Sequence, residues 1–87
     1  MNKNFTDKGF EDYVYWQTQD RKTLKRINEL IKDIERNGVA EGIGKPEALK
    51  HKMSGMWSRR IDEKNRLIYI VDENDCLNIV SCRGHYE

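Results

Sequence analysis

The sequence predicts an α+β fold in which two N-terminal helices pack on one face of a small antiparallel sheet. Apolar residues recur at spacings of three and four over the first part of the chain, which is typical of amphipathic helices. Apolar and polar residues then alternate in the last third, which is typical of strands. Because the chain has only 87 residues, we expect one domain that spans residues 1–87.

The first helix is predicted over residues 7–19. Thr6 is a suitable N-cap, and Phe10, Tyr13 and Val14 follow at helical spacing. The residues before Thr6 are too polar to be a good candidate for a strand.

The second helix is predicted to begin after Asp20, which can cap it, and to end at Asn37-Gly38. One face of this helix carries a regular apolar stripe, formed by Leu24, Ile27, Leu30, Ile31 and Ile34. The two helices follow each other so closely that we expect an antiparallel hairpin, and we assign the stripe to the core rather than to catalysis.

Residues 37–55 are predicted to form a long irregular loop, because they contain several glycines and Pro46. A loop of this length in a small domain is more often functional than not. Three strands are predicted after it, over residues 56–62, 66–71 and 77–83, with polar turns between them.

The strand register decides which side chains share a face of the sheet. If the second turn has an even number of residues, Val71 pairs with Cys76 and Arg66 with Ser81. Arg66 and His85 then point to the same side. The register of the first hairpin stays open, since an odd loop puts Arg60 opposite Arg66 and an even loop separates them.

Composition excludes several classes of protein. The sequence is 37% hydrophobic and 36% charged, which indicates a globular rather than a disordered chain. No apolar run approaches the roughly 18 residues that a membrane span needs. The N-terminus lacks the apolar stretch of a secretory signal, so we expect the cytoplasm.

Cys76 and Cys82 are predicted to be free thiols. Six residues apart on one strand, their Cα atoms would be separated by roughly 20 Å, and a disulfide tolerates only about 7 Å. One zinc ion could not bind both sulfurs either, and we expect no metal and no cofactor.

Positive charge is concentrated in the middle of the chain, although the net charge is only +1. Residues 45–66 carry seven lysines and arginines against three acidic residues. A surface that binds phosphate groups would be sought there.

Few residues could perform chemistry, and no serine triad, phosphate-binding loop or metal-ligand spacing is present. Cleavage of RNA without a metal needs a base for the 2′-hydroxyl, an acid for the leaving 5′-oxygen and cations for the transition state. Glu47, His85, Arg60, Arg66 and Lys50 supply these groups. Most small domains contain such residues, so their presence alone makes this function only permissible.

Sequence motifs over nearly the whole chain resemble the YoeB/Txe toxins of type II toxin–antitoxin systems, in the RelE/ParE superfamily. They are DYVYWQ (12–17), KRINELIKD (25–33), KPEALKH (45–51), MSG (53–55), WSRRI (57–61), NRLIY (65–69) and the pair His85-Tyr86.

The resemblance implies a RelE-like microbial RNase fold and a toxin endoribonuclease, an mRNA interferase. Such an enzyme cleaves mRNA in the ribosomal A site by 2′-hydroxyl attack without a metal, which inhibits translation and growth. The implied partners are a YefM-type antitoxin, the ribosome and mRNA. Operator DNA would be bound only through the antitoxin complex, a homodimer is compatible with the family, and no membrane is involved.

The resemblance also implies roles for single residues. Glu47 matches the family's proposed general base, His85 its general acid and Arg66 the group that stabilises the scissile phosphate. Lys50, Arg60 and Tyr86 match residues that line the same site. Nothing in the sequence fixes which of Glu47 and His85 is the base and which the acid.

Three neighbouring residues are given other roles. We expect His51 to be structural and Trp57 to be a core or sheet-face aromatic rather than a base-stacking residue. Arg59 alternates away from Arg60 on a strand, so we expect it to contact ribosomal RNA or solvent.

Two other functions remain as alternatives. A ParE-like toxin with the same fold would poison DNA gyrase, and that class does not depend on a Glu/Arg/His site. A non-catalytic subunit would act only within an autoregulatory, DNA-binding complex with its antitoxin.

Overall fold

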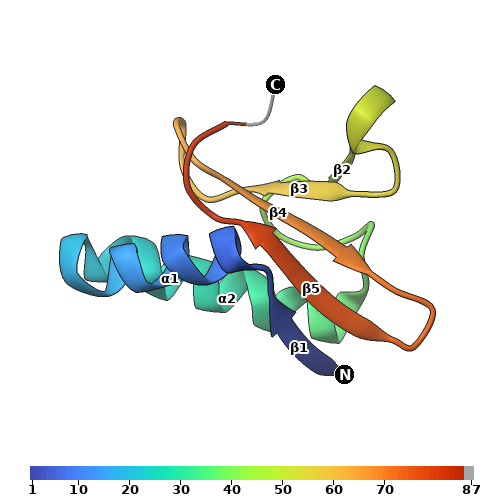
Figure 1. The fold of residues 1–87 in the computed structure, drawn as a ribbon, viewed down its shortest axis with the longest axis horizontal. Coiled ribbons are helices and arrows are strands. Elements are labelled where there is room, and N and C mark those ends of the chain that lie inside the picture. The colour runs from blue at the N-terminus through green and yellow to red at the C-terminus, as the bar shows by residue number, and fades with distance from the viewer. Residues whose placement is uncertain (86–87) are drawn as a thin grey trace.

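In the computed structural model, which describes residues 1–85, two helices cover one face of a five-stranded mixed sheet (Figure 1). The elements are β1 (Asn2–Phe5), α1 (Asp7–Gln19), α2 (Arg21–Asn37), β2 (Glu47–Ala48), a short 3-10 helix (His51–Met53), β3 (Trp57–Arg60), β4 (Arg66–Val71) and β5 (Cys76–Ser81). The strands are ordered β1-β5-β4-β3-β2 across the sheet. The predicted α+β class is confirmed.

The helix boundaries follow from the predicted caps. The Thr6 side chain accepts a hydrogen bond from the Gly9 N–H, and Asp20 accepts from Lys22 and Thr23. Gly38 ends α2 with φ +90°, a conformation that favours glycine. Since Asp20 alone separates the helices, α2 runs back along α1 as predicted (Figure 1).

The core lies between the helices and the sheet. The predicted stripe of α2 supplies Ile27, Leu30 and Ile34, each with no exposed surface, and Leu24 is partly buried beside them. The buried side of α1 is formed by Gly9, Asp12 and Trp16. Gly9 allows α1 to lie directly on β5, because a Cβ there would clash with the Ile79 carbonyl.

Two short strands lie outside the three that the sequence predicts. The polar β1 pairs in parallel with β5, so the sheet is mixed rather than wholly antiparallel. The two-residue β2 lies within the predicted loop and pairs with β3. The partner of β1 lies more than 70 residues away, whereas β2 pairs with the strand that follows it. Both segments are too short and too polar to carry an alternation that would reveal them.

The predicted pairing of Val71 with Cys76 is wrong, because Val71 pairs with Leu77. Asp75 adopts φ +59°, and a three-residue turn replaces the expected even one. The register then shifts between Ile68 and Tyr69, so Ser81 pairs with Ile68 rather than with Arg66. This bulge restores the expected facing of the strand ends, and Arg66 donates its backbone N–H to the Gly84 carbonyl at 3.0 Å.

Cys76 and Cys82 are both buried free thiols, as predicted. Burial, with a smaller contribution from the Asp12 carboxylate, raises the pKa of the Cys82 thiol to about 12. This thiol is therefore protonated at neutral pH and does not provide a nucleophile.

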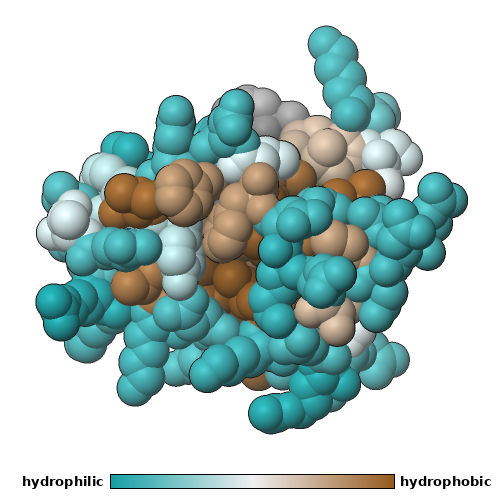
Figure 2. All heavy atoms as spheres, turned by 60° about the horizontal axis from the view of Figure 1, so that its bottom comes forward, coloured by the Kyte–Doolittle hydropathy of each residue, from teal (hydrophilic) through white to brown (hydrophobic). Residues whose placement is uncertain are grey.

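The helical side of the molecule carries exposed apolar groups. Figure 2, turned so that the lower side of Figure 1 comes forward, shows hydrophobic side chains gathered within a largely hydrophilic surface. On α1, Phe10 and Val14 are 56% and 42% exposed. Neither helix described in residues 1–85 has the length and apolarity to cross a bilayer.

Candidate active site

The face of the sheet opposite the helices carries the candidate site. Directly opposite residues in paired strands point to the same face. Glu47 pairs with Ser58, and Arg60 pairs with Arg66, which settles the register that the sequence left open. Because Ser58 and Arg60 are two residues apart on β3, both pairs lie on one face.

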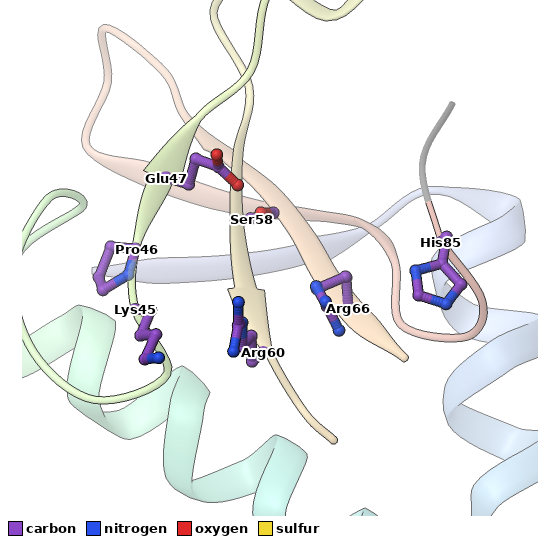
Figure 3. Close-up of a pocket in the computed structure, with 7 residues that line it drawn as sticks. All are labelled: Lys45, Pro46, Glu47, Ser58, Arg60, Arg66 and His85. Carbon is purple, nitrogen blue, oxygen red and sulfur yellow. The ribbon is translucent and has the colours of Figure 1, made fainter. Parts of the chain in front are cut away.

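These residues line an open cleft of about 660 Å³ (Figure 3). Of residues 1–85, those that line the cleft are Lys45, Pro46, Glu47, Ser58, Arg60, Arg66 and His85. Figure 3 shows Arg66 between Arg60 and His85, and Glu47 leaning from β2 toward Ser58 on β3. Among the described residues that line the cleft, Lys45, Arg60 and Arg66 are basic and Glu47 is the one acidic residue, so these side chains favour the binding of an anion.

Lys45 enters the cleft from a strained piece of loop. Its φ of +52° is uncommon for a residue with a side chain, and Pro46 further restricts it. The preceding Gly44 accepts a 2.7 Å hydrogen bond from the Arg60 backbone N–H, which fastens the loop along β3. The loop is thus held where it carries Lys45 and Glu47 to the same cleft as the arginines.

The Arg66 guanidinium is partly anchored beside the turn between β3 and β4. Its Nη1 donates to the carbonyls of Asp62, at 2.8 Å, and Asn65, at 3.2 Å. Main-chain carbonyls orient the side chain without neutralising its charge. A planar guanidinium held in this way can still donate to a phosphate in the cleft.

The segment that leads to His85 leaves the sheet after Ser81 and is held by α1. The Cys82 N–H donates to Asp12 at 3.0 Å, and the Trp16 indole donates to the Cys82 carbonyl at 2.8 Å. The Arg83 guanidinium lies 3.6 Å from the centroid of the Tyr15 ring. These contacts hold residues 82 and 83, so that His85 reaches the cleft.

The expectation for Arg59 is wrong, because its side chain is completely buried. Its guanidinium forms an ion pair with Asp33 at 2.5 Å and donates to Tyr69 at 2.9 Å. It also donates to three carbonyls of the preceding loop, those of Gly38, Glu41 and Ile43. Arg59 therefore fastens this loop to α2 and to the sheet instead of contacting RNA.

The cleft brings together four of the six residues that the sequence singled out: Glu47, Arg60, Arg66 and His85. Within the described residues 1–85, Lys50 is exposed and lies outside the cleft lining. Tyr86 lies outside the described residues. Trp57 packs against the core cluster, as expected.

Sequence reasoning missed Lys45, Pro46 and Ser58 as lining residues. Strand alternation could have found Ser58, because it lies two residues before Arg60. Lys45 is part of the basic stretch, but only its loop conformation brings it here. In residues 1–85, no three His, Cys, Asp or Glu side chains gather closely enough to hold a metal ion.

Comparison with known proteins identifies the family. The profile of a YoeB-like toxin of bacterial type II toxin-antitoxin systems matches residues 5–86. The chain belongs to the YoeB family. It is 52% identical to Toxin YoeB of Escherichia coli K12, an alignment that covers 99% of this chain and 100% of that protein.

Solved YoeB structures have the same fold. The heterotetrameric YoeB-YefM complex of Staphylococcus aureus contains a chain with a TM-score of 0.90 and 52% identity, covering 99% of this chain and 98% of that one. A YoeB dimer of the same organism gives a TM-score of 0.91 and 51% identity at the same coverage. The YoeB-type fold that the sequence motifs implied is confirmed.

Proposed function

We propose that this YoeB-family toxin is a ribosome-dependent endoribonuclease that cleaves mRNA in the A site and thereby inhibits translation. The observation that carries the proposal is the convergence of Glu47, Arg66 and His85 on one cationic cleft. Glu47 comes from β2, Arg66 from β4 and His85 from the segment after β5.

In the proposed reaction, the 2′-oxygen of one nucleotide attacks the adjacent phosphorus while Glu47 accepts the 2′-hydroxyl proton. The bond between phosphorus and the 5′-oxygen breaks, and His85 donates a proton to that oxygen. The products are a 2′,3′-cyclic phosphate and a 5′-hydroxyl. Glu47 has gained one proton and His85 has lost one, and proton exchange with water returns both groups to their starting states. General acid and base catalysis of this kind contributes about 10²- to 10⁴-fold each.

We assign to Arg66 and Arg60 the stabilisation of the negative charge that develops on the phosphoryl oxygens in the transition state. They lie opposite each other on adjacent strands, so the two guanidiniums can bind one phosphate from neighbouring positions. Donors fixed before the reaction contribute about 10²- to 10³-fold. Lys45 adds a third cation, which we assign to a flanking phosphate of the message.

The proposed partners are the ribosome with its mRNA and a YefM-type antitoxin, by analogy with the Staphylococcus aureus complex. An antitoxin that stabilises the inactive state must bury toxin surface, and the exposed Phe10 and Val14 are apolar groups available for this. Operator DNA would be contacted through that complex. A homodimer, as in the Staphylococcus aureus YoeB structure, is a further expected assembly.

Mapping of mRNA 5′ ends tests the proposal. Wild-type protein added to a translating ribosome on a defined message should produce discrete cuts within the A-site codon, and His85→Ala should produce none while still binding antitoxin. Intact transcripts with DNA damage in induced cells would instead support a gyrase poison. If cell-free translation proceeds normally after the wild-type protein is added, the result would support a purely structural subunit.

A further inference from the structure

Gly84, the residue before His85, is held through both of its backbone polar groups. Its N–H donates to the Asn65 side-chain oxygen at 2.8 Å, and its carbonyl accepts from the Arg66 N–H at 3.0 Å. Its φ of +86° suits glycine and turns the chain toward the cleft. The last peptide before the imidazole is therefore fastened to the turn that also carries Arg66.

The Asn65 amide is itself oriented by Asp62. The Asn65 Nδ2 donates to both carboxylate oxygens of Asp62, at 3.1 and 3.2 Å, which leaves Oδ1 to face Gly84. Asp62 also accepts from the backbone N–H groups of Lys64 and Asn65, at 2.8 and 2.7 Å. The carboxylate thus fixes the turn and the rotamer of Asn65 together.

The charge of Asp62 is maintained in this network. Burial alone would raise its pKa, but the hydrogen bonds from Asn65 and the Lys64 N–H outweigh that effect and lower it. The acceptor that orients Asn65 is thus ionised at neutral pH, and charge-assisted hydrogen bonds of this kind are stronger than neutral ones.

We infer that Asn65 is a positioning residue, which holds the Gly84 peptide and thereby places the His85 imidazole beside Arg66 in the cleft. The inference rests on the proposed function for its catalytic consequence, but the placement of the ring can be measured independently. The helix α1 holds the neighbouring Cys82 and Arg83, so Asn65 completes a clamp on the segment from the opposite side.

A double-mutant cycle tests whether Asn65 acts through His85. Asn65→Ala should lower the single-turnover rate of mRNA cleavage by roughly 10- to 100-fold, as expected for a misplaced catalytic group. Affinity for a message with a 2′-deoxynucleotide at the cleavage position should change by less than about twofold, since the phosphate-binding cations remain. On the His85→Ala background, Asn65→Ala should have no further effect on rate. If the rate losses of Asn65→Ala and His85→Ala multiply in the double variant, the inference is overturned.

Exchange of the two turn residues provides a rescue. The variant Asp62→Asn/Asn65→Asp keeps an acceptor for the Gly84 N–H and a donor between the two side chains. This double variant should cleave mRNA faster than Asn65→Ala. It should also be faster than Asn65→Asp alone, because that single change places two carboxylates next to each other. Asn74→Ala, in the turn at the other end of β4, is the matched control and should cleave at the wild-type rate.

NMR separates this inference from the proposed function, because it needs no RNA. The chain contains two histidines, so the ring signals of His85 can be compared with those of His51 in one spectrum. In Asn65→Ala, the His85 signals should shift and show increased fast motion, while the His51 signals stay in place. Superimposable His85 signals in wild type and Asn65→Ala would refute the clamp, whether or not the wild type cleaves mRNA.

Discussion

Two adjacent arginines on β3 have opposite surroundings. Arg59 points toward α2 and is completely buried, with an ion pair to Asp33 and hydrogen bonds to the loop carbonyls. Arg60 is exposed and lines the cleft on the other face, opposite Arg66. Strand alternation sets the direction of each side chain, but segments far away in sequence decide what each guanidinium meets. Arg59 therefore stabilises the fold, and Arg60 is available for the proposed chemistry.

The largest expected effect is on the buried face. Arg59→Met removes the cation paired with Asp33 and the donor to three loop carbonyls, so it should lower the free energy of unfolding by about 3–5 kcal/mol. The total free energy of unfolding of a typical domain is about 5–15 kcal/mol, so this loss would be a large part of it. Urea denaturation measures this loss. A change below about 1 kcal/mol would show that the buried pair contributes little and would remove the contrast between the two arginines.

The neighbouring substitution should have the opposite profile. Arg60→Gln should reduce the rate of mRNA cleavage by about 10- to 100-fold, or about 1.4–2.7 kcal/mol of transition-state stabilisation. Its free energy of unfolding should stay within about 0.5 kcal/mol of wild type, as for other surface substitutions. Single-turnover kinetics and the same urea titration provide both numbers. Normal cleavage by a folded Arg60→Gln would exclude this side chain from the phosphate site.

A smaller effect appears in the pH dependence of stability. Burial alone would raise the pKa of Asp33, but hydrogen bonds from Arg59, the Ile43 N–H and Asn37 hold it below its ordinary value of 3.8. A carboxyl with a lowered folded-state pKa adds stability above its unfolded pKa, and this stability is lost as the pH falls through the folded value. The stability difference between wild type and Asp33→Asn should therefore shrink as the pH falls below about 4. Parallel curves from pH 6 to pH 3 would contradict the assigned ion pair.

The predictable parts of the fold were those with local, periodic signals. The bounds of α2 could be predicted from local sequence alone, because the helix has a regular apolar stripe and is capped by Asp20 and Gly38. The strand β1 was missed because Asn2–Phe5 is polar and its parallel pairing depends on β5, more than 70 residues away. The prediction of the β4–β5 register was wrong because the positive φ of Asp75 and the bulge near Tyr69 leave no periodic signal in the sequence.

The candidate site shows the same division. The family motifs pointed to Glu47, Arg66 and His85, and alternation put Arg60 and Arg59 on opposite faces. The partner of Arg59 could not be predicted, because Asp33 lies 26 residues earlier on a helix whose charged positions otherwise look like a solvated face. Lys45 was missed because its entry into the cleft depends on an unusual backbone conformation rather than on residue type.

The central claim is that one cleft assembles a base, an acid and cations on a single phosphodiester whose own 2′-hydroxyl attacks. The most direct measurement uses two ribosome-bound messages that differ by one oxygen atom, the 2′-hydroxyl at the mapped cleavage position. The wild-type protein should cut the all-ribose message to a 2′,3′-cyclic phosphate and a 5′-hydroxyl, and should leave the 2′-deoxy message uncut at that position. Equal cleavage of both messages there would contradict the account.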